Sequence, residues 1–147
     1  MAMYLAVALG GALGTIGRYF VSGLVANAFG ETFPWGTLII NITGSFIIGF
    51  FGTLTAPEGR LMVSGMTRQF VMVGICGGYT TFSSFSLQTL DLIRGGAMVR
   101  AGANIVLSVA LCVAAVALGH FIAAQFNSHA VPVAQLPIEE EAEIADV

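Results

Sequence analysis

Four long apolar runs make up most of this chain and limit what it can fold into. They cover approximately residues 4–28, 34–55, 61–93 and 98–124. A helix needs about 20 residues to cross the hydrocarbon core of a bilayer, so each run is long enough to span once. Only 9% of the residues are charged, whereas an average soluble domain carries about 25%. The sequence therefore predicts an all-α membrane protein with four transmembrane helices.

The composition changes after residue 126. Residues 127–147 hold five of the eight acidic residues and two prolines, and we expect this tail to be disordered. Residues 1–126 are predicted to form one transmembrane domain. A cleavable signal peptide is not expected, because no basic segment precedes the first run and Arg18 interrupts it. Cys76 and Cys112 stand singly in apolar runs and are interpreted as small buried hydrophobic residues.

The arginines give almost no orientation signal. With four spans, Arg60 and Arg68 lie on the side of the two termini, and Arg94 and Arg100 lie on the opposite side. Orientation follows the bias of lysine and arginine in short loops, and here two residues stand against two. The balance favours insertion in both orientations, so that opposed copies could pair as an antiparallel, dual-topology homodimer. A single orientation set by helix hydrophobicity or by Arg18 remains the alternative.

Polar residues follow one face of two of the predicted helices. Thr37, Asn41 and Ser45 are spaced by four in the second run. The fourth run repeats that spacing with Asn104, Ser108 and Cys112. A buried amide must find hydrogen-bond partners. These stripes indicate either a polar track for a hydrated solute or hydrogen bonds that join helices.

The first run carries a small-residue ridge, Gly10 and Gly14, with Arg18 one turn further on. Glycines at this spacing let helix backbones approach closely in lipid. An arginine inside a span usually faces a partner or a wet cavity. Arg18 therefore either faces such a site or extends to the nearer membrane surface.

The third run contains the most unusual stretch, GICGGYTTFSSFSLQTL, residues 74–90. Gly77 and Gly78 are poor helix formers, and the hydroxyl groups behind them compete for backbone hydrogen bonds. We expect the helix to break mid-membrane at Gly77–Gly78 and to free carbonyl groups that can hold a cation. Phe82 and Phe85 follow on one face, and the positive edge of an aromatic ring is a weak contact for an anion.

The chemistry excluded by the sequence is also informative. Asp91 lies near the end of its run, and no acidic residue lies mid-span, whereas a proton-coupled exporter normally needs a carboxylate inside the membrane. The sequence contains no nucleophile–base pair, phosphate-binding loop or metal-ligand cluster, so we expect neither an enzyme nor a nucleic-acid partner. These observations indicate passive conduction of a small anion.

Three segments together resemble one family. GGYTTFSSFS in the third run, GTLIINITGSFIIG in the second and the pair Gly17–Arg18 in the first are similar to the CrcB/Fluc family of fluoride channels. The resemblance covers residues 1 to about 124. It implies an antiparallel dual-topology homodimer that exports fluoride passively across the bacterial inner membrane.

The resemblance also implies roles for individual residues. A structural sodium ion, which is not transported, would be held by the backbone carbonyls of Gly77 and Thr80. The fluoride pathway would include the positions that match the family's ring, amide, hydroxyl and arginine groups: Phe82, Phe85, Asn41, Thr37, Ser83, Ser84, Ser108 and Arg18. It would also include Gln88 and Asn104, where many members carry glutamate and tyrosine.

Two other functions remain as alternatives. A small dual-topology multidrug exporter also has four helices, but it predicts a glutamate in the first span, which this chain lacks there. A non-conducting membrane scaffold would explain the glycine ridge, but it would not explain the run of hydroxyl residues that follows Gly78.

Overall fold

The computed structural model describes residues 1–57 and 59–127, all in helices and their connections. The helices, in chain order, are α1 (Ala2–Phe29), α2 (Trp35–Leu54), α3 (Gly65–Gln69), the π-helical segment η1 (Phe70–Cys76), α4 (Gly77–Tyr79), α5 (Phe82–Arg94) and α6 (Met98–Ala124). No strand occurs in these residues. The predicted tail beyond Asn127 lies outside them.

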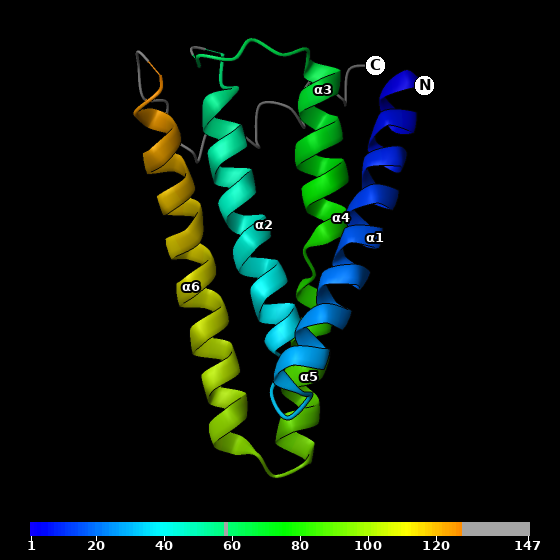
Figure 1. The fold of residues 1–147 in the computed structure, drawn as a ribbon, viewed down its shortest axis with the longest axis vertical. Coiled ribbons are helices and arrows are strands. Elements are labelled where there is room, and N and C mark those ends of the chain that lie inside the picture. The colour runs from blue at the N-terminus through cyan, green and yellow to red at the C-terminus, as the bar shows by residue number, and fades with distance from the viewer. Residues whose placement is uncertain (58, 128–147) are drawn as a thin grey trace.

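Four helical stretches are long and apolar enough to cross a membrane, as expected. They are α1, α2, the composite third span Gly65–Arg94 and α6. In Figure 1 the α1–α2 and α5–α6 connections lie at one end of the bundle, and the α2–α3 connection lies at the other with the N-terminus and the end of α6. Each end of the bundle carries two arginines. Arg60 and Arg68 lie near the start of the third span, whereas Arg94 ends that span and Arg100 lies in the first turn of α6.

Close backbone contact holds α1 to the first part of the third span. A Cβ atom added at Gly10 or Gly14 would overlap the carbonyl oxygens of Phe70 or Ile75. The glycine ridge of the first run is therefore a helix-packing surface. Gly49 and Gly119 act in the same way between α2 and α6, which lie side by side (Figure 1).

The end of α6 is tied to the end of α2 by polar side chains. The Thr53 hydroxyl is 2.8 Å from His120 Nδ1, and Asn127 Nδ2 donates to the Thr53 carbonyl at 2.7 Å. Asn127 Oδ1 accepts from the Arg60 amide at 2.9 Å. The two Asn127 bonds satisfy the Thr53 carbonyl at the end of α2 and the Arg60 amide in the connection that follows.

The third span changes its neighbour part of the way along. Its first part, α3 to α4, packs against α1, whereas α5 packs chiefly against α6. The change occurs at two residues with extended backbone, Thr80 (φ −80°, ψ 160°) and Thr81 (φ −155°, ψ 110°). We call these two residues the Thr80–Thr81 link.

Candidate ion pathway beside the Thr80–Thr81 link

The location of the link differs from the sequence expectation. Gly77 and Gly78, where we expected the interruption, are helical; Gly77 has φ −64° and ψ −38°. A Cβ atom at Gly78 would lie 2.5 Å from the Gly11 carbonyl oxygen. Gly78 is therefore needed for close approach to α1 and not for an unusual conformation, and the prediction of a break at Gly77–Gly78 was wrong by about three residues.

Asn41 of α2 holds the link through both atoms of its amide. Thr81 N donates to Asn41 Oδ1 at 2.8 Å, and Asn41 Nδ2 donates to the Thr81 carbonyl at 3.1 Å. The side chain thus replaces the backbone partners that Thr81 would have in a continuous helix, as a part-buried peptide group requires. We call this pair of hydrogen bonds the Asn41 clamp.

The clamp also affects the carbonyl groups that precede the link. In an α-helix the amide of Thr81 would bond to the carbonyl of Gly77, but it donates to Asn41 instead. The Ser84 amide, which would bond to the Thr80 carbonyl, donates to Thr81 Oγ1 at 3.2 Å. Both carbonyls, which the family resemblance assigns to a cation site, are thereby released from helical hydrogen bonding.

The hydroxyl run forms the N-terminal cap of α5. Thr81 Oγ1 accepts from the Ser84 amide and lies 3.1 Å from Ser84 Oγ and 3.2 Å from Ser83 Oγ. A threonine at this position is a preferred helix cap. Ser83 is exposed and Ser84 is half-buried. In this structure both predicted pathway residues have a local role, because their bonds to Thr81 help to start α5 within the third span.

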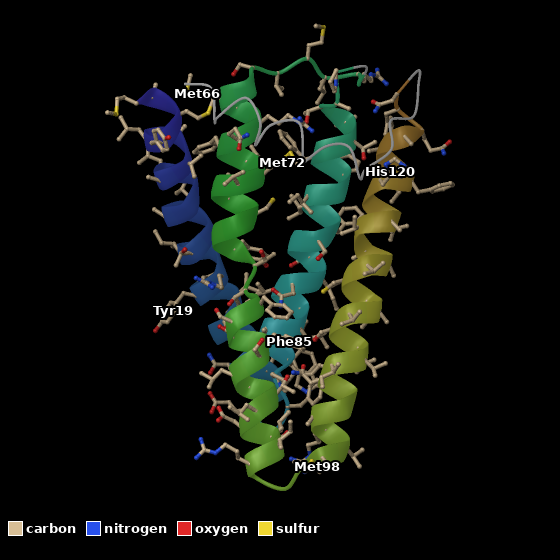
Figure 2. All side chains as sticks on the ribbon, turned by 180° about the vertical axis from the view of Figure 1, so that it is seen from behind. Tyr19, Met66, Met72, Phe85, Met98 and His120 are labelled. Carbon is tan, nitrogen blue, oxygen red and sulfur yellow. The ribbon has the colours of Figure 1, made fainter. Side chains whose placement is uncertain are left out.

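One cavity of about 430 Å³ brings together several of the predicted residues. Gly77, Thr80 and Asn41 line it from one side, and Phe82, Phe85 and Ser108 complete its wall. The rings of Phe82 and Phe85 are 5.2 Å apart and tilted by 49°. Figure 2 shows Phe85 between α5 and the pair formed by α2 and α6. We call this space the link cavity.

The two rings differ in their surroundings. Phe85 is 9% exposed and fixed by its neighbours, whereas Phe82 is 76% exposed in the single chain. An exposed ring at mid-span contacts lipid or another protein surface. Within one chain, the Phe85 ring is therefore buried and the Phe82 ring is exposed on the surface.

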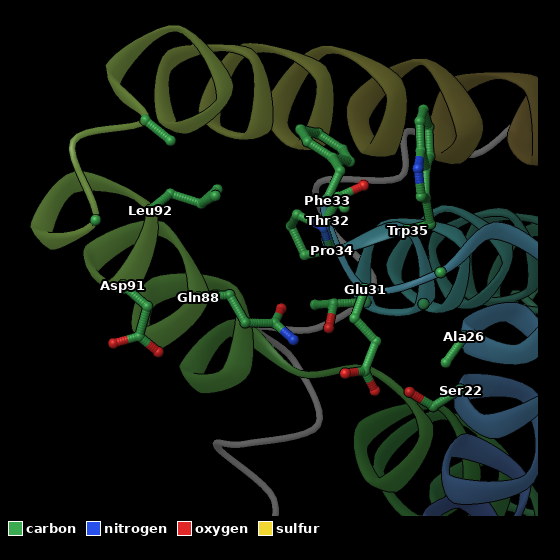
Figure 3. A pocket seen from close by; sticks show the side chains of 15 residues that line it. Ser22, Ala26, Glu31, Thr32, Phe33, Pro34, Trp35, Gln88, Asp91 and Leu92 are labelled. Carbon is green, nitrogen blue, oxygen red and sulfur yellow. The ribbon is translucent and has the colours of Figure 1, made fainter.

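Thr37 and Gln88 line a second cavity, of about 510 Å³, next to the α1–α2 connection. In Figure 3 the side chain of Gln88 extends toward Glu31, the Glu31 carboxylate points toward Ser22, and Asp91 points away. Gln88 Oε1 is buried and has no hydrogen-bond partner within the described residues. We call this space the end cavity. It lies beside the α1–α2 and α5–α6 connections and not beside the link.

The sequence stripes are thus divided between sites. Thr37 reaches the end cavity, and Asn41 and Ser45 reach the link cavity. Neither cavity is lined by Arg18, Ser83, Ser84 or Asn104. Arg18 is half-buried on α1, and Asn104 is 2% exposed between α5 and α6.

Thr89 is a residue that the sequence reading missed. It is 7% exposed and bonds both to Phe85 of its own helix and to Asn104 of α6. The signal was available, because Thr89 follows Phe85 by four positions and therefore lies on the same helix face.

Acidic and soft metal ligands do not gather in this part of the chain. No group of three His, Cys, Asp or Glu side chains that could hold a metal occurs within residues 1–57 and 59–127. The oxygen atoms available to a cation at the link are those of backbone carbonyls, the Asn41 amide and hydroxyl groups, which suit hard cations.

Comparisons with known proteins agree on one family. The sequence profile described as CrcB-like protein, Camphor Resistance (CrcB), matches residues 5–120. A relative from Opitutus terrae is 63% identical over 128 residues, which are 87% of this chain and 97% of the relative. A relative from Methylobacterium radiotolerans is 62% identical over 135 residues, 92% of this chain and 94% of the relative. A third, from Rhodospirillum rubrum, is 60% identical over 124 residues, 84% and 96% of the two chains. Each of the three is named a fluoride-specific ion channel, FluC.

Proposed function

The chain belongs to the CrcB family, and from that membership we propose that it is a fluoride-specific ion channel of the bacterial inner membrane that exports fluoride passively. One structural observation supports this most strongly. The link cavity collects two phenylalanine rings, the Ser108 hydroxyl and the Asn41 amide around a site with no carboxylate lining it. Hydrogen-bond donors and ring edges suit a small anion, and the lack of a carboxylate suits passive conduction better than proton coupling.

The cavity offers an anion contacts of limited strength. Moving a bare ion into a low-dielectric interior costs tens of kcal/mol by Born estimates. Protein groups must therefore replace the water molecules of its hydration shell all along the pathway. Conduction also requires that binding stay weak enough for the ion to leave. Rings and neutral polar groups meet both needs. We assign Phe82, Phe85, Asn41 and Ser108 to the conducting wall.

The remaining predicted residues fit different parts of the pathway. Thr37 and Gln88 would contact fluoride in the end cavity, where it exchanges with solution. Ser83 and Ser84 would act at the capped start of α5, where the helix dipole favours an anion. Arg18 would raise the local anion concentration from α1.

We further propose that two copies pair in opposite orientations. The balance of two arginines at each end permits both orientations, and the exposed Phe82 ring supplies apolar surface for a partner. In such a pair the third span would be interrupted mid-membrane at the link, where a partner chain could cover the released backbone groups. A two-fold axis through the link would complete the pathway with residues from both copies.

The same pairing would create a site for a structural sodium ion. The carbonyls of Gly77 and Thr80 are released from helical bonding, as described above, and both residues line the link cavity. Two opposed copies would offer four such oxygen atoms, which suit a hard monovalent cation. These residues fit the ion, which would hold the two links together and would not be transported.

Fluoride efflux from liposomes tests the channel function directly. In the presence of sodium, vesicles loaded with potassium fluoride should release fluoride rapidly when valinomycin carries potassium out as the counter-ion. The release is followed with a fluoride electrode, and chloride release should be far slower. Double replacement of Phe82 and Phe85 by isoleucine serves as the matched low-conductance variant. Absence of fluoride release from vesicles that contain well-folded protein would refute the function.

A further inference from the structure

A directed chain of hydrogen bonds joins α5 to α6 behind the link cavity. Thr89 Oγ1 donates to the Phe85 carbonyl at 2.7 Å. Asn104 Nδ2 donates to Thr89 Oγ1 at 2.8 Å, and Ser108 Oγ donates to Asn104 Oδ1 at 3.5 Å. The side chains of Thr89, Asn104 and Ser108 are all less than 10% exposed.

The direction of these bonds follows from the chemistry of the groups. The Phe85 carbonyl can only accept, so it takes the single hydroxyl proton of Thr89. The Thr89 oxygen must then accept from Asn104, and only the amide NH₂ can donate. Because the amide orientation is fixed in this way, Asn104 Oδ1 faces Ser108, and Ser108 must donate its own single proton to it.

Ser108 is the member of the chain that lines the link cavity, together with Phe82 and Phe85. An anion in this cavity needs a donor, but the Ser108 proton is already engaged with Asn104. That bond, at 3.5 Å, is much longer than the 2.7–2.8 Å typical of O–H···O bonds and is the weakest of the three. It is therefore the bond that an arriving anion would displace most easily.

We propose that Thr89 and Asn104 are positioning residues that make Ser108 a conditional donor. Asn104 Oδ1 holds the Ser108 proton while the cavity contains no anion, and Ser108 turns it to fluoride when the ion arrives. This inference rests on the proposed channel function. No proton changes its covalent partner, because one hydrogen bond of the hydroxyl replaces another.

The arrangement has a consequence for affinity. Fluoride must displace an existing hydrogen bond, which lowers its net binding at Ser108 and helps it to leave. Removing the competing acceptor should therefore tighten binding. A neutral hydrogen bond of ordinary length contributes a factor of about 2 to 12 in an equilibrium constant, and for this long bond we expect about two- to fivefold.

Asn104→Leu and Asn104→Ala remove the competing acceptor and test the proposal. Fluoride affinity is measured in two ways: as the half-saturating concentration for liposome efflux, and by ¹⁹F NMR titration of the purified protein with sodium fluoride. In either variant the half-saturating concentration should fall by about two- to fivefold. In a Ser108→Ala background the same substitutions should change nothing. Asn104→Ala adds no atoms, so it remains usable if leucine disturbs folding.

Thr89 supplies a matched pair of variants. Thr89→Ser keeps both hydrogen bonds and should match the wild type, whereas Thr89→Val leaves the Asn104 NH₂ without its acceptor. The amide can then turn its NH₂ toward Ser108, which frees the serine proton, so affinity should rise as it does for Asn104→Ala.

The possible failures are separable. An unchanged or increased half-saturating concentration in the Asn104 variants, or an equal fall without the Ser108 hydroxyl, would overturn the relay. Loss of fluoride release from the wild type would instead refute the channel itself.

Discussion

Replacing Asn41 by leucine should destabilise the protein through two lost hydrogen bonds. The clamp satisfies the Thr81 amide at 2.8 Å and the Thr81 carbonyl at 3.1 Å. A buried polar group left without a partner costs about 1–3 kcal/mol. Because both groups are only part-buried, we use the lower half of that range for each. The free energy of unfolding should fall by about 2–4 kcal/mol.

Two control variants separate the clamp from other effects of the site. Asn41→Asp keeps an acceptor for the Thr81 amide and loses the donor, so its loss should be about half as large. It should nevertheless conduct less fluoride than its stability suggests, because a carboxylate on the cavity wall repels an anion. Ser45→Ala alters the same cavity one helical turn away, outside the clamp, and should stay within about 0.5 kcal/mol of the wild type.

The assay is unfolding in mixed micelles by titration with sodium dodecyl sulfate, followed by circular dichroism. Fluoride efflux is measured in parallel on each variant. If Asn41→Leu is no less stable than Ser45→Ala, the two hydrogen bonds do not hold the link, and the reasoning from their geometry fails.

Four further outcomes are expected. Phe82→Ile with Phe85→Ile should cut fluoride efflux at least tenfold while gel filtration stays unchanged, because isoleucine fills space without a ring edge; wild-type efflux would mean that the rings only pack. Gly78→Ala should lower stability more than Gly77→Ala in the same unfolding assay, since a Cβ at Gly78 meets the α1 backbone whereas one at Gly77 meets only the Met72 carbonyl oxygen at 4.0 Å; equal losses would contradict this packing. Exchange of all sodium for N-methyl-D-glucamine should slow efflux without ²²Na⁺ being carried in its presence, and unchanged efflux would exclude a required ion. A reporter at the C-terminus should be found on both sides of the membrane, and detection on one side alone would exclude dual topology.

The four spans could be predicted closely from the sequence. The apolar runs 34–55 and 98–124 coincide within one residue with α2 and α6, because bilayer thickness fixes how much apolar chain a helix needs. The third run, 61–93, is longer than one crossing needs, and the third span of the structure covers Gly65–Arg94.

The site was predictable in its residue types but not in its grouping. Spacing by four shows that Thr37, Asn41 and Ser45 share a helix face. It does not show which neighbour lies opposite each turn of that face. Asn41 meets Thr81, 40 positions away in the chain, and Thr37 faces a different cavity. Such pairings depend on how the helices pack, which no local pattern encodes.

The position of the link has a packing explanation that glycine propensity could not supply. The third span must satisfy two different neighbours: Gly74 and Gly78 fit its first part against the backbone of α1, and Thr89 bonds its last part to α6 through Asn104. A straight helix packed against α1 would not also pack along α6. The chain therefore turns between these two contacts. A turn at Gly74 or Gly78 would disrupt the close contact with α1 that these two glycines allow. The turn falls after Tyr79, on two threonines, one of which caps the new helix while Asn41 supplies the missing backbone partners. The same solution leaves the carbonyls of Gly77 and Thr80 beside the link cavity, so the residues that redirect the helix also make its polar site.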